Sequence, residues 1–246
     1  MAHFVLVHGA CHGGWCWEAV VPLLSAAGHS VACPDMPGRG DDPRDPAGLT
    51  LADQARAVLD AARAAPSQEK AGGGEVILVG HSAGGFAIAA AAEAAPELAR
   101  RLVFVAALLP RDGHRLTEVM RNLSARHPDM RFIPARHGAA YVFDTARAGP
   151  VLYNGTTDAQ AEAALARICA EPTAPHGEAI ALGPAFDRVA KSYVLCTADH
   201  VIPAADQQRM AAAAGAAITR IDTGHSPFLS TPGALADHLL SLTGSA

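Results

Sequence analysis

The feature that most constrains this chain is a glycine-framed serine motif at residues 80–84, which matches the pattern G-x-S-x-G. It follows the apolar run 76–79 and precedes an alanine-rich segment that extends to about Ala95. A buried strand must therefore turn sharply into a helix, and small residues around the serine let the backbone bend. This context predicts that Ser82 is a nucleophile raised above a sheet, at the positive end of the following helix.

The rest of the chain alternates between short apolar runs and segments with helical spacing. This alternation predicts an α/β fold built on a doubly wound, mostly parallel sheet, with helices on both faces. Thr50 and Asp53 are expected to form a capping box at the start of one helix. The expected strands span residues 4–7, 29–33, 76–79, 102–108, 192–196 and 217–221. The expected helices span residues 15–27, 50–65, 84–95, 204–214 and 232–242.

The alternation stops between residues 110 and 183. This segment is rich in Arg, His, Pro and Gly, and its helical pattern is clearest near residues 158–170. It is too long for an ordinary loop, so we interpret it as a helical cap inserted over the sheet. The core domain would then consist of residues 1–109 and 184–246, with a glycine-rich linker at residues 72–74.

Two residues near the carboxyl end can activate the serine. A serine hydroxyl is a weak nucleophile until a base removes its proton, and after such a motif the partners follow in the order Ser, Asp or Glu, then His. Asp199 and His225 each follow one of the last two expected strands. The carboxyl ends of parallel strands border the crevice of such a sheet, so both are predicted to meet Ser82 there. Asp222 and His200 are the nearest alternatives.

Acyl transfer also needs two N–H groups that point at the developing oxyanion. One is expected from Ala83, directly after the nucleophile, and the other from the glycine-rich loop after the first strand, most naturally from Ala10.

An alternative interpretation of the same loop is a metal site. The candidate ligands would be His8, Cys11, His12 and Cys16. Zinc sites usually need two well-separated ligand pairs, and no second pair of Cys or His stands out. We therefore expect no metal and no other cofactor.

Composition limits the partners and the compartment. The chain has 246 residues and a formal net charge of -5, which gives no reason to expect nucleic acid. Its five cysteines are an odd count, which favours reduced thiols and the cytoplasm. The first residues show no signal-peptide pattern, and no window approaches the roughly 18 apolar residues of a membrane span. A small molecule is the expected partner.

Five segments closely resemble the plant methylesterase and hydroxynitrile lyase family within the α/β-hydrolases. The segment 4–15 contains His-Gly-Ala-Cys-His-Gly-Gly-Trp, and the segment 76–85 contains Gly-His-Ser-Ala-Gly-Gly. The resemblance implies the α/β-hydrolase fold, a helical cap, the triad Ser82, Asp199 and His225, and oxyanion donors at Ala10 and Ala83. The segments are residues 4–15, 21–29, 76–85, 196–203 and 224–230.

Two positions indicate the branch of this family. The lyases typically carry threonine and lysine where this chain has Gly9 and Ser226. Both differences favour hydrolysis of a carboxylic ester through an acyl-enzyme, for example a methyl ester of an aromatic or polycyclic acid. The methylesterases usually have Met at position 226, so the substrate set stays open. We predict that Gly9, His12, Trp15 and Ser226 border the substrate pocket.

Other functions remain as alternatives. The same scaffold can serve a hydroxynitrile-lyase-type or other carbon–carbon lyase, a cofactor-free oxygenase, or a non-catalytic protein that binds a small ligand. A Rossmann dinucleotide site is disfavoured, because the glycines lack G-x-G-x-x-G spacing. Seven arginines between residues 111 and 147 are interpreted as a solvated helical face, and a homodimer is left open.

Overall fold

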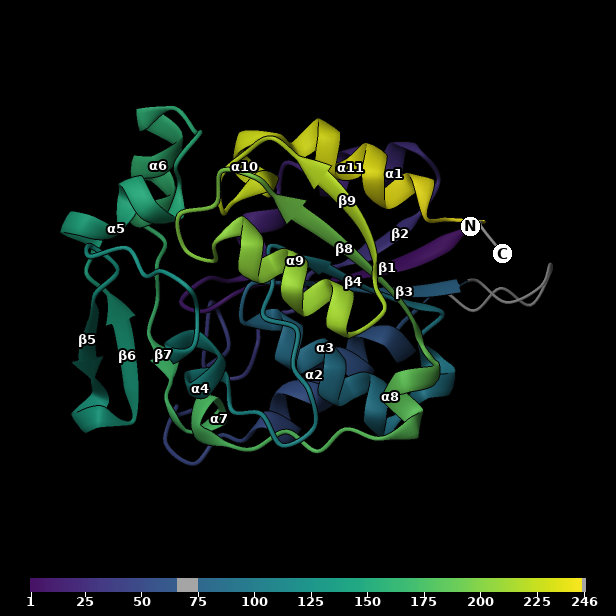
Figure 1. The fold of residues 1–246 in the computed structure, drawn as a ribbon, viewed down its shortest axis with the longest axis horizontal. Coiled ribbons are helices and arrows are strands. Elements are labelled where there is room, and N and C mark those ends of the chain that lie inside the picture. The colour runs from purple at the N-terminus through teal and green to yellow at the C-terminus, as the bar shows by residue number, and fades with distance from the viewer. Residues whose placement is uncertain (66–74, 245–246) are drawn as a thin grey trace.

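A six-stranded sheet forms the centre of the computed structural model, which describes residues 1–65 and 75–244. Its strand order is β2-β1-β3-β4-β8-β9, and every pairing between neighbouring strands is parallel. The doubly wound parallel sheet expected from the alternation is therefore confirmed (Figure 1). The strands are β1 (Ala2–Val7), β2 (Ser30–Ala32), β3 (Glu75–His81), β4 (Arg101–Val105), β8 (Ala190–Cys196) and β9 (Ala217–Ile221).

Helices cover both faces of the sheet, because alternate strand residues point to opposite sides. On one face, Val5 and Val7 of β1 belong to a core cluster that includes residues of α2 and α3. On the other face, Phe4 and Leu6 pack in a second cluster with residues of α1 and α11. The core helices are α1 (Val21–Ala26), α2 (Leu51–Arg63), α3 (Gly84–Ala94), α8 (Pro184–Arg188), α9 (Ala204–Ala213), α10 (Pro227–Ser230) and α11 (Pro232–Ser241).

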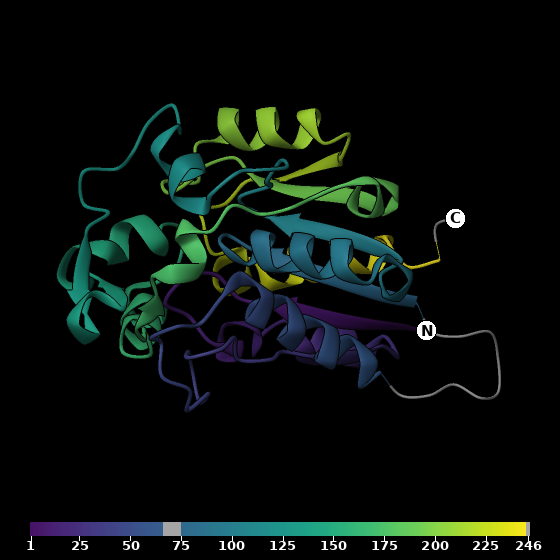
Figure 2. The same cartoon turned by 90° about the horizontal axis from the view of Figure 1, so that it is seen from below.

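We call residues 110–183 the cap. Its helices and strands from α4 to α7 lie beyond the carboxyl ends of the central strands, and the chain then returns along the core to α8 (Figures 1 and 2). The cap contains helices, as expected, but also a three-stranded antiparallel sheet that the sequence analysis did not anticipate. These strands are short, so they carry too little alternation to be recognised from sequence. The cap elements are α4 (Leu116–Arg121), β5 (Phe132–Ala135), β6 (Ala140–Phe143), α5 (Thr145–Leu152), α6 (Asp158–Leu165), β7 (Glu171–Pro172) and α7 (Ala174–Gly177).

Several expected boundaries need correction. The helix expected at residues 15–27 is divided into a 3₁₀ helix, Gly14–Trp17, and α1, which has a proline in its first turn. A proline has no N–H, so it starts a helix more readily than it continues one. The strand expected at 102–108 ends at Val105, because Ala106 takes a left-handed φ of 42°.

Two further expectations concern local features. The Thr50–Asp53 capping box is present at the start of α2. The predicted linker at residues 72–74 lies outside the described residues. No helix in the described part of the chain is long and apolar enough to cross a membrane.

Candidate active site

Ser82 occupies a strained turn between β3 and α3. Its φ of 51° lies in the left-handed region, which a residue with a side chain rarely adopts. Hydrogen bonds to β4 and to the residues that follow it hold this turn: the Ser82 N–H donates to the Val105 carbonyl, and the Ser82 carbonyl accepts from the Leu108 N–H. A side chain at Gly80 would not fit, because its Cβ would lie 2.8 Å from the Gly84 carbonyl oxygen. The sharp turn expected at the G-x-S-x-G motif is therefore present.

Asp199 and His225 form a buried pair at the ends of β8 and β9. The His225 Nδ1 lies 2.8 Å from Asp199 Oδ2. A carboxylate can only accept, so Nδ1 carries the proton and Nε2 is left with a lone pair. Asp199 Oδ1 also accepts from the N–H groups of Val201 and Ile202, at 2.7 and 2.9 Å. The carboxylate is thus oriented by its own loop and can orient the imidazole in turn.

Gln207 is a site residue that the sequence analysis missed. Its Nε2 donates to Asp199 Oδ2 at 2.9 Å and to the Ile202 carbonyl at 2.8 Å. Gln207 is fully buried on α9, and its Oε1 accepts from the Cys196 N–H at the end of β8. This side chain fixes the second oxygen of the Asp199 carboxylate, and nothing in its local sequence indicates that role.

The alternative acid and base are engaged elsewhere. Asp222 Oδ1 accepts from the Thr197 hydroxyl at 2.7 Å, and His200 lies exposed with its Nδ1 3.3 Å from the Pro150 carbonyl oxygen. Neither belongs to the buried pair.

Ala10 and Ala83 each place a backbone N–H group near Ser82. Ala10 and Ala83 both line the same cavity as Ser82. Among residues 1–65 and 75–244, no hydrogen-bond acceptor is recorded for the N–H of either alanine. Gly9 brings the first loop close to Ser82, since a Cβ at Gly9 would lie 2.8 Å from the Cβ of Ser82. The arrangement offers two donors to an oxyanion formed at this place.

Burial lowers the pKa of three other buried histidines. The pKa of His8 falls to about 3 and that of His12 to about 4, and the pKa of His81 falls well below its ordinary value. The nitrogens of His12 are both engaged, by the Ala10 carbonyl at 2.8 Å and the Tyr153 hydroxyl at 2.9 Å. His81 Nε2 donates to the His225 carbonyl at 2.9 Å and so supports the loop that carries His225.

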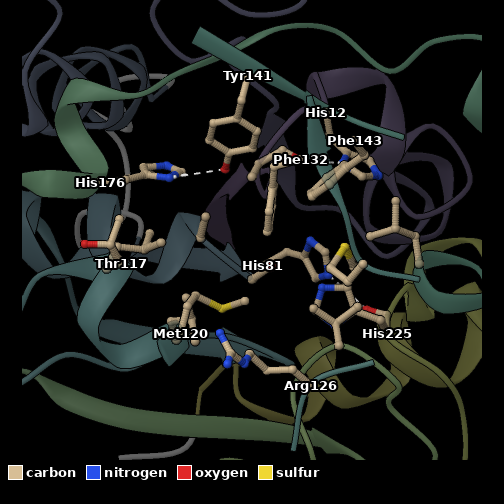
Figure 3. A pocket seen from close by; sticks show the side chains of 18 of the residues that line it. His12, His81, Thr117, Met120, Arg126, Phe132, Tyr141, Phe143, His176 and His225 are labelled. Atoms are coloured by element: carbon tan, nitrogen blue, oxygen red, sulfur yellow. Dashed lines mark hydrogen bonds between the residues drawn. The ribbon is translucent and has the colours of Figure 1, made fainter. Parts of the chain in front are cut away.

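A cavity of about 470 Å³ opens above Ser82, between the sheet and the cap (Figure 3). Its wall is mainly apolar, and no acidic side chain lines it among the described residues. Arg121 and Arg126 of the cap line it. Both are exposed, as expected for a solvated face, but Arg126 lies outside the helices. The lining residues outside the group already described include Leu108, Leu116, Thr117, Met120, Met130, Phe132, Tyr141, Phe143, Leu152, Thr173, His176 and Val201.

The four residues predicted to border the pocket have different positions. His12 lines the cavity. Gly9 lies beneath it against Ser82, where a side chain has no room. Trp15 is not a lining residue; it stacks on His12 with ring centroids 5.3 Å apart. Ser226 is also outside the lining, because its buried hydroxyl donates to the Leu152 carbonyl at 2.8 Å.

The alternative of a metal site in the first loop finds no support. Among the described residues, no group of three or more His, Cys, Asp or Glu side chains could hold a metal ion. His8, one of the candidate ligands, uses Nε2 to accept from the Met36 N–H at 3.0 Å. Cys11 and Cys16 are buried free thiols whose pKa burial raises well above the ordinary value.

Known proteins share this fold and much of this sequence. Over 138 residues, the chain is 41% identical to salicylic acid-binding protein 2 of Nicotiana tabacum; this match covers 54% of the chain and about half, 51%, of that protein. It is 29% identical to methylesterase 2 of Arabidopsis thaliana over 98% of the chain and 95% of that protein. A pyrethroid hydrolase from Sphingobium faniae has a similar structure, with a TM-score of 0.83 and 25% identity over 98% of this chain and 96% of that one.

The family itself is shown by a match along nearly the whole chain. Residues 4–238 match the Alpha/beta hydrolase family, and this range includes the turn at Ser82, the pair Asp199–His225 and the cap. The parallel sheet and the solved relative agree with that match. The chain belongs to the α/β-hydrolase family.

Proposed function

We propose that this protein is a serine hydrolase that cleaves a carboxylic ester, with Ser82, His225 and Asp199 as its catalytic triad. The observation that carries the proposal is that Ser82, on its strained turn, and His225, oriented by Asp199, line one cavity. The names of the relatives, among them a methylesterase and a pyrethroid hydrolase, support ester chemistry.

The reaction would proceed in two steps. His225 Nε2 takes the proton of the Ser82 hydroxyl as its oxygen attacks the ester carbonyl, and the N–H groups of Ala10 and Ala83 stabilise the oxyanion. The same proton then passes to the departing alcohol, which leaves an acyl-enzyme. In the second step His225 deprotonates a water molecule, and attack on the acyl-enzyme frees the acid and restores Ser82.

The cavity indicates the kind of ester. Its volume of about 470 Å³ and its apolar wall suit a hydrophobic acid or alcohol, including an aromatic or polycyclic acid carried as its methyl ester. We further propose that residues 110–183 act as the cap of this site, because Met120, Phe132 and Phe143 supply much of that wall.

The positions of Arg121 and Arg126 predict that substrates with a negative charge are preferred. Both are exposed cap residues at the cavity, and neither forms an ion pair among the described residues. Figure 3 shows Arg126 among the side chains that line the cavity. For 4-nitrophenyl esters of long dicarboxylic acids, we expect kcat/KM about fivefold higher when the far end is a carboxylate than when it is the matching primary amide.

The preference should depend on salt and on the two arginines. It should shrink as ionic strength rises, because exposed charges are screened beyond about 10 Å at 0.1 M salt. The double variant Arg121→Gln, Arg126→Gln should lower the carboxylate-to-amide ratio towards one. Arg188→Gln removes a positive charge that is also exposed but lies outside the cavity lining, and it should leave the ratio unchanged. A ratio of one in the wild type would refute the preference.

A lyase is the main competing function, and one experiment separates the two. Incubation with phenyl acetate and, separately, with mandelonitrile should give ester turnover and no Ser82-dependent release of benzaldehyde. Cyanohydrin cleavage needs a cation beside the base to stabilise departing cyanide, and position 226 offers only a serine whose hydroxyl points to Leu152. Arg126 lines the same cavity and carries a positive charge of the kind that a lyase would need. The experiment can therefore distinguish the two functions. Benzaldehyde release without ester turnover would show that the protein is a lyase and that the proposed hydrolase function is wrong.

A further inference from the structure

A buried carboxylate connects the cap to the loop that carries one of the oxyanion donors. Glu171 of β7 is fully buried, and Arg39 of the core donates to both of its oxygens, at 2.8 and 3.0 Å. His176 Nε2 lies 2.9 Å from Oε1. The third donor is a backbone group: the Cys11 N–H reaches Oε2 at 2.9 Å. Both oxygens of this one side chain are therefore saturated by groups from the core and the cap.

The segment around Glu171 holds Cys11 from both sides. While the Cys11 N–H donates to Glu171, the Cys11 carbonyl accepts from the Cys169 N–H at 3.0 Å. Cys11 has a φ of 60°, in the left-handed region, so its conformation needs support from its surroundings. The Cys11 N–H belongs to the peptide group that joins Ala10 to Cys11, and the Cys11 carbonyl belongs to the next peptide group. The Ala10 N–H lies in the peptide group directly before these two, so holding them restricts the position of the Ala10 N–H.

The carboxylate stays charged over a wide pH range. Burial opposes its ionisation, but the Arg39 guanidinium and the hydrogen bond from His176 outweigh burial and bring the pKa of Glu171 to about 2. Arg39 in turn depends on Glu171: its Nε and Nη2 are buried, and neither has a hydrogen-bond partner among the described residues. Arg39 and Glu171 form a buried ion pair between cap and core, and removal of one partner leaves the charge of the other uncompensated.

The same network reaches the cavity wall. Tyr141 and His176 both line the cavity, and the Tyr141 hydroxyl lies 3.2 Å from His176 Nδ1 (Figure 3). Since His176 Nε2 contacts Glu171, a continuous chain of polar contacts runs from the cavity wall to the Cys11 N–H. A substrate that packs against this wall touches the far end of that chain.

We propose that Glu171 is a positioning residue: through Cys11 it holds the Ala10 N–H where the oxyanion forms, and it thereby makes turnover depend on the docked cap. This inference rests on the proposed ester hydrolysis, in which Ala10 is an oxyanion donor. It assigns the cap strand β7 a role in the rate, in addition to the role of the cap as a wall of the cavity.

The first test is Glu171→Gln, which keeps the size of the side chain but turns one acceptor oxygen into a donor. We expect kcat for 4-nitrophenyl esters to fall about a hundredfold with little change in KM, because a small displacement of a catalytic group costs about that factor. Affinity for a trifluoromethyl ketone, which forms an oxyanion on the serine, should fall in parallel, while affinity for the product acid should not change. Asp129→Asn breaks an exposed cap ion pair with Arg147 and should leave kcat and both affinities unchanged.

A second variant separates positioning from folding. Arg39→Met, Glu171→Met replaces the whole charge pair by apolar side chains, a change that buried pairs often tolerate in stability. We expect the unfolding temperature of this double variant to approach that of the wild type. Its kcat should stay low, because the Cys11 N–H still lacks its acceptor. Recovery of wild-type kcat in this double variant would show that Glu171 only neutralises Arg39, and it would overturn the proposal.

A third measurement does not depend on turnover. Amide hydrogen exchange in the peptide that contains Cys11 should be faster in Glu171→Gln than in the wild type and unchanged in Asp129→Asn. If the wild type hydrolyses no ester but this exchange difference appears, the proposed function fails and the connection of cap to loop stands. If esters are hydrolysed and neither exchange nor kcat changes, the positioning role fails and the proposed function stands.

Discussion

Replacement of Ser82 by alanine should abolish ester turnover, with a fall in kcat of about a millionfold, to the level that binding and the oxyanion donors alone support. The reason is that no other nucleophile takes its place: Cys11, also near the cavity, is a buried thiol with a raised pKa. Rates of 4-nitrophenyl ester hydrolysis at saturating substrate measure the effect. Thermal unfolding should change little, because the strained turn is held by backbone hydrogen bonds that the substitution retains.

Covalent labelling gives an independent check on the same residue. A serine-directed phosphonate should add once to the wild type and not at all to Ser82→Ala, as read by intact-protein mass. Ser25→Ala removes an exposed hydroxyl on α1, far from the motif, and should label and react like the wild type. Persistent labelling of the Ser82→Ala protein would mean that the nucleophile lies elsewhere.

Asp199→Asn should cost about ten-thousandfold in kcat, the loss known for the corresponding change in a serine protease triad. In the native protein, Asp199 Oδ2 accepts from His225 Nδ1, which leaves Nε2 free to act as the base. An amide at this position can donate to Nδ1 and so favours the tautomer whose Nε2 is already protonated. The measurement is kcat for a neutral ester at saturating concentration across pH 6 to 9.

Asp222→Asn is the matched control, because Asp222 follows β9 but bonds to Thr197 rather than to the base. It should retain near wild-type rates. If Asp222→Asn is inactive and Asp199→Asn is not, the choice of carboxylate is wrong. The variant Gln207→Leu should lie between these extremes, since it removes one hydrogen bond to Asp199 without changing its charge.

The sequence by itself determined the sheet, the turn at Ser82 and the chain order of the site residues. Strands buried on both faces appear as continuous apolar runs, and a strand-to-helix turn leaves a local glycine pattern, so both can be predicted from short windows. The positions of Asp199 and His225 followed from the rule that crevices form at the carboxyl ends of parallel strands. Each of these inferences uses neighbours in sequence or a general property of parallel sheets.

Only the tertiary structure decided which distant side chains meet. Gln207 reaches Asp199 from another element, and Glu171 approaches Cys11 across 160 residues of chain. Trp15 and Ser226 are near the site in sequence terms, yet their side chains turn to His12 and Leu152. Buried polar groups form hydrogen bonds with whichever partners the packed chain brings close. A local sequence pattern does not predict which partners these are. The cap strands and the arginines at the cavity were therefore found only from the structure.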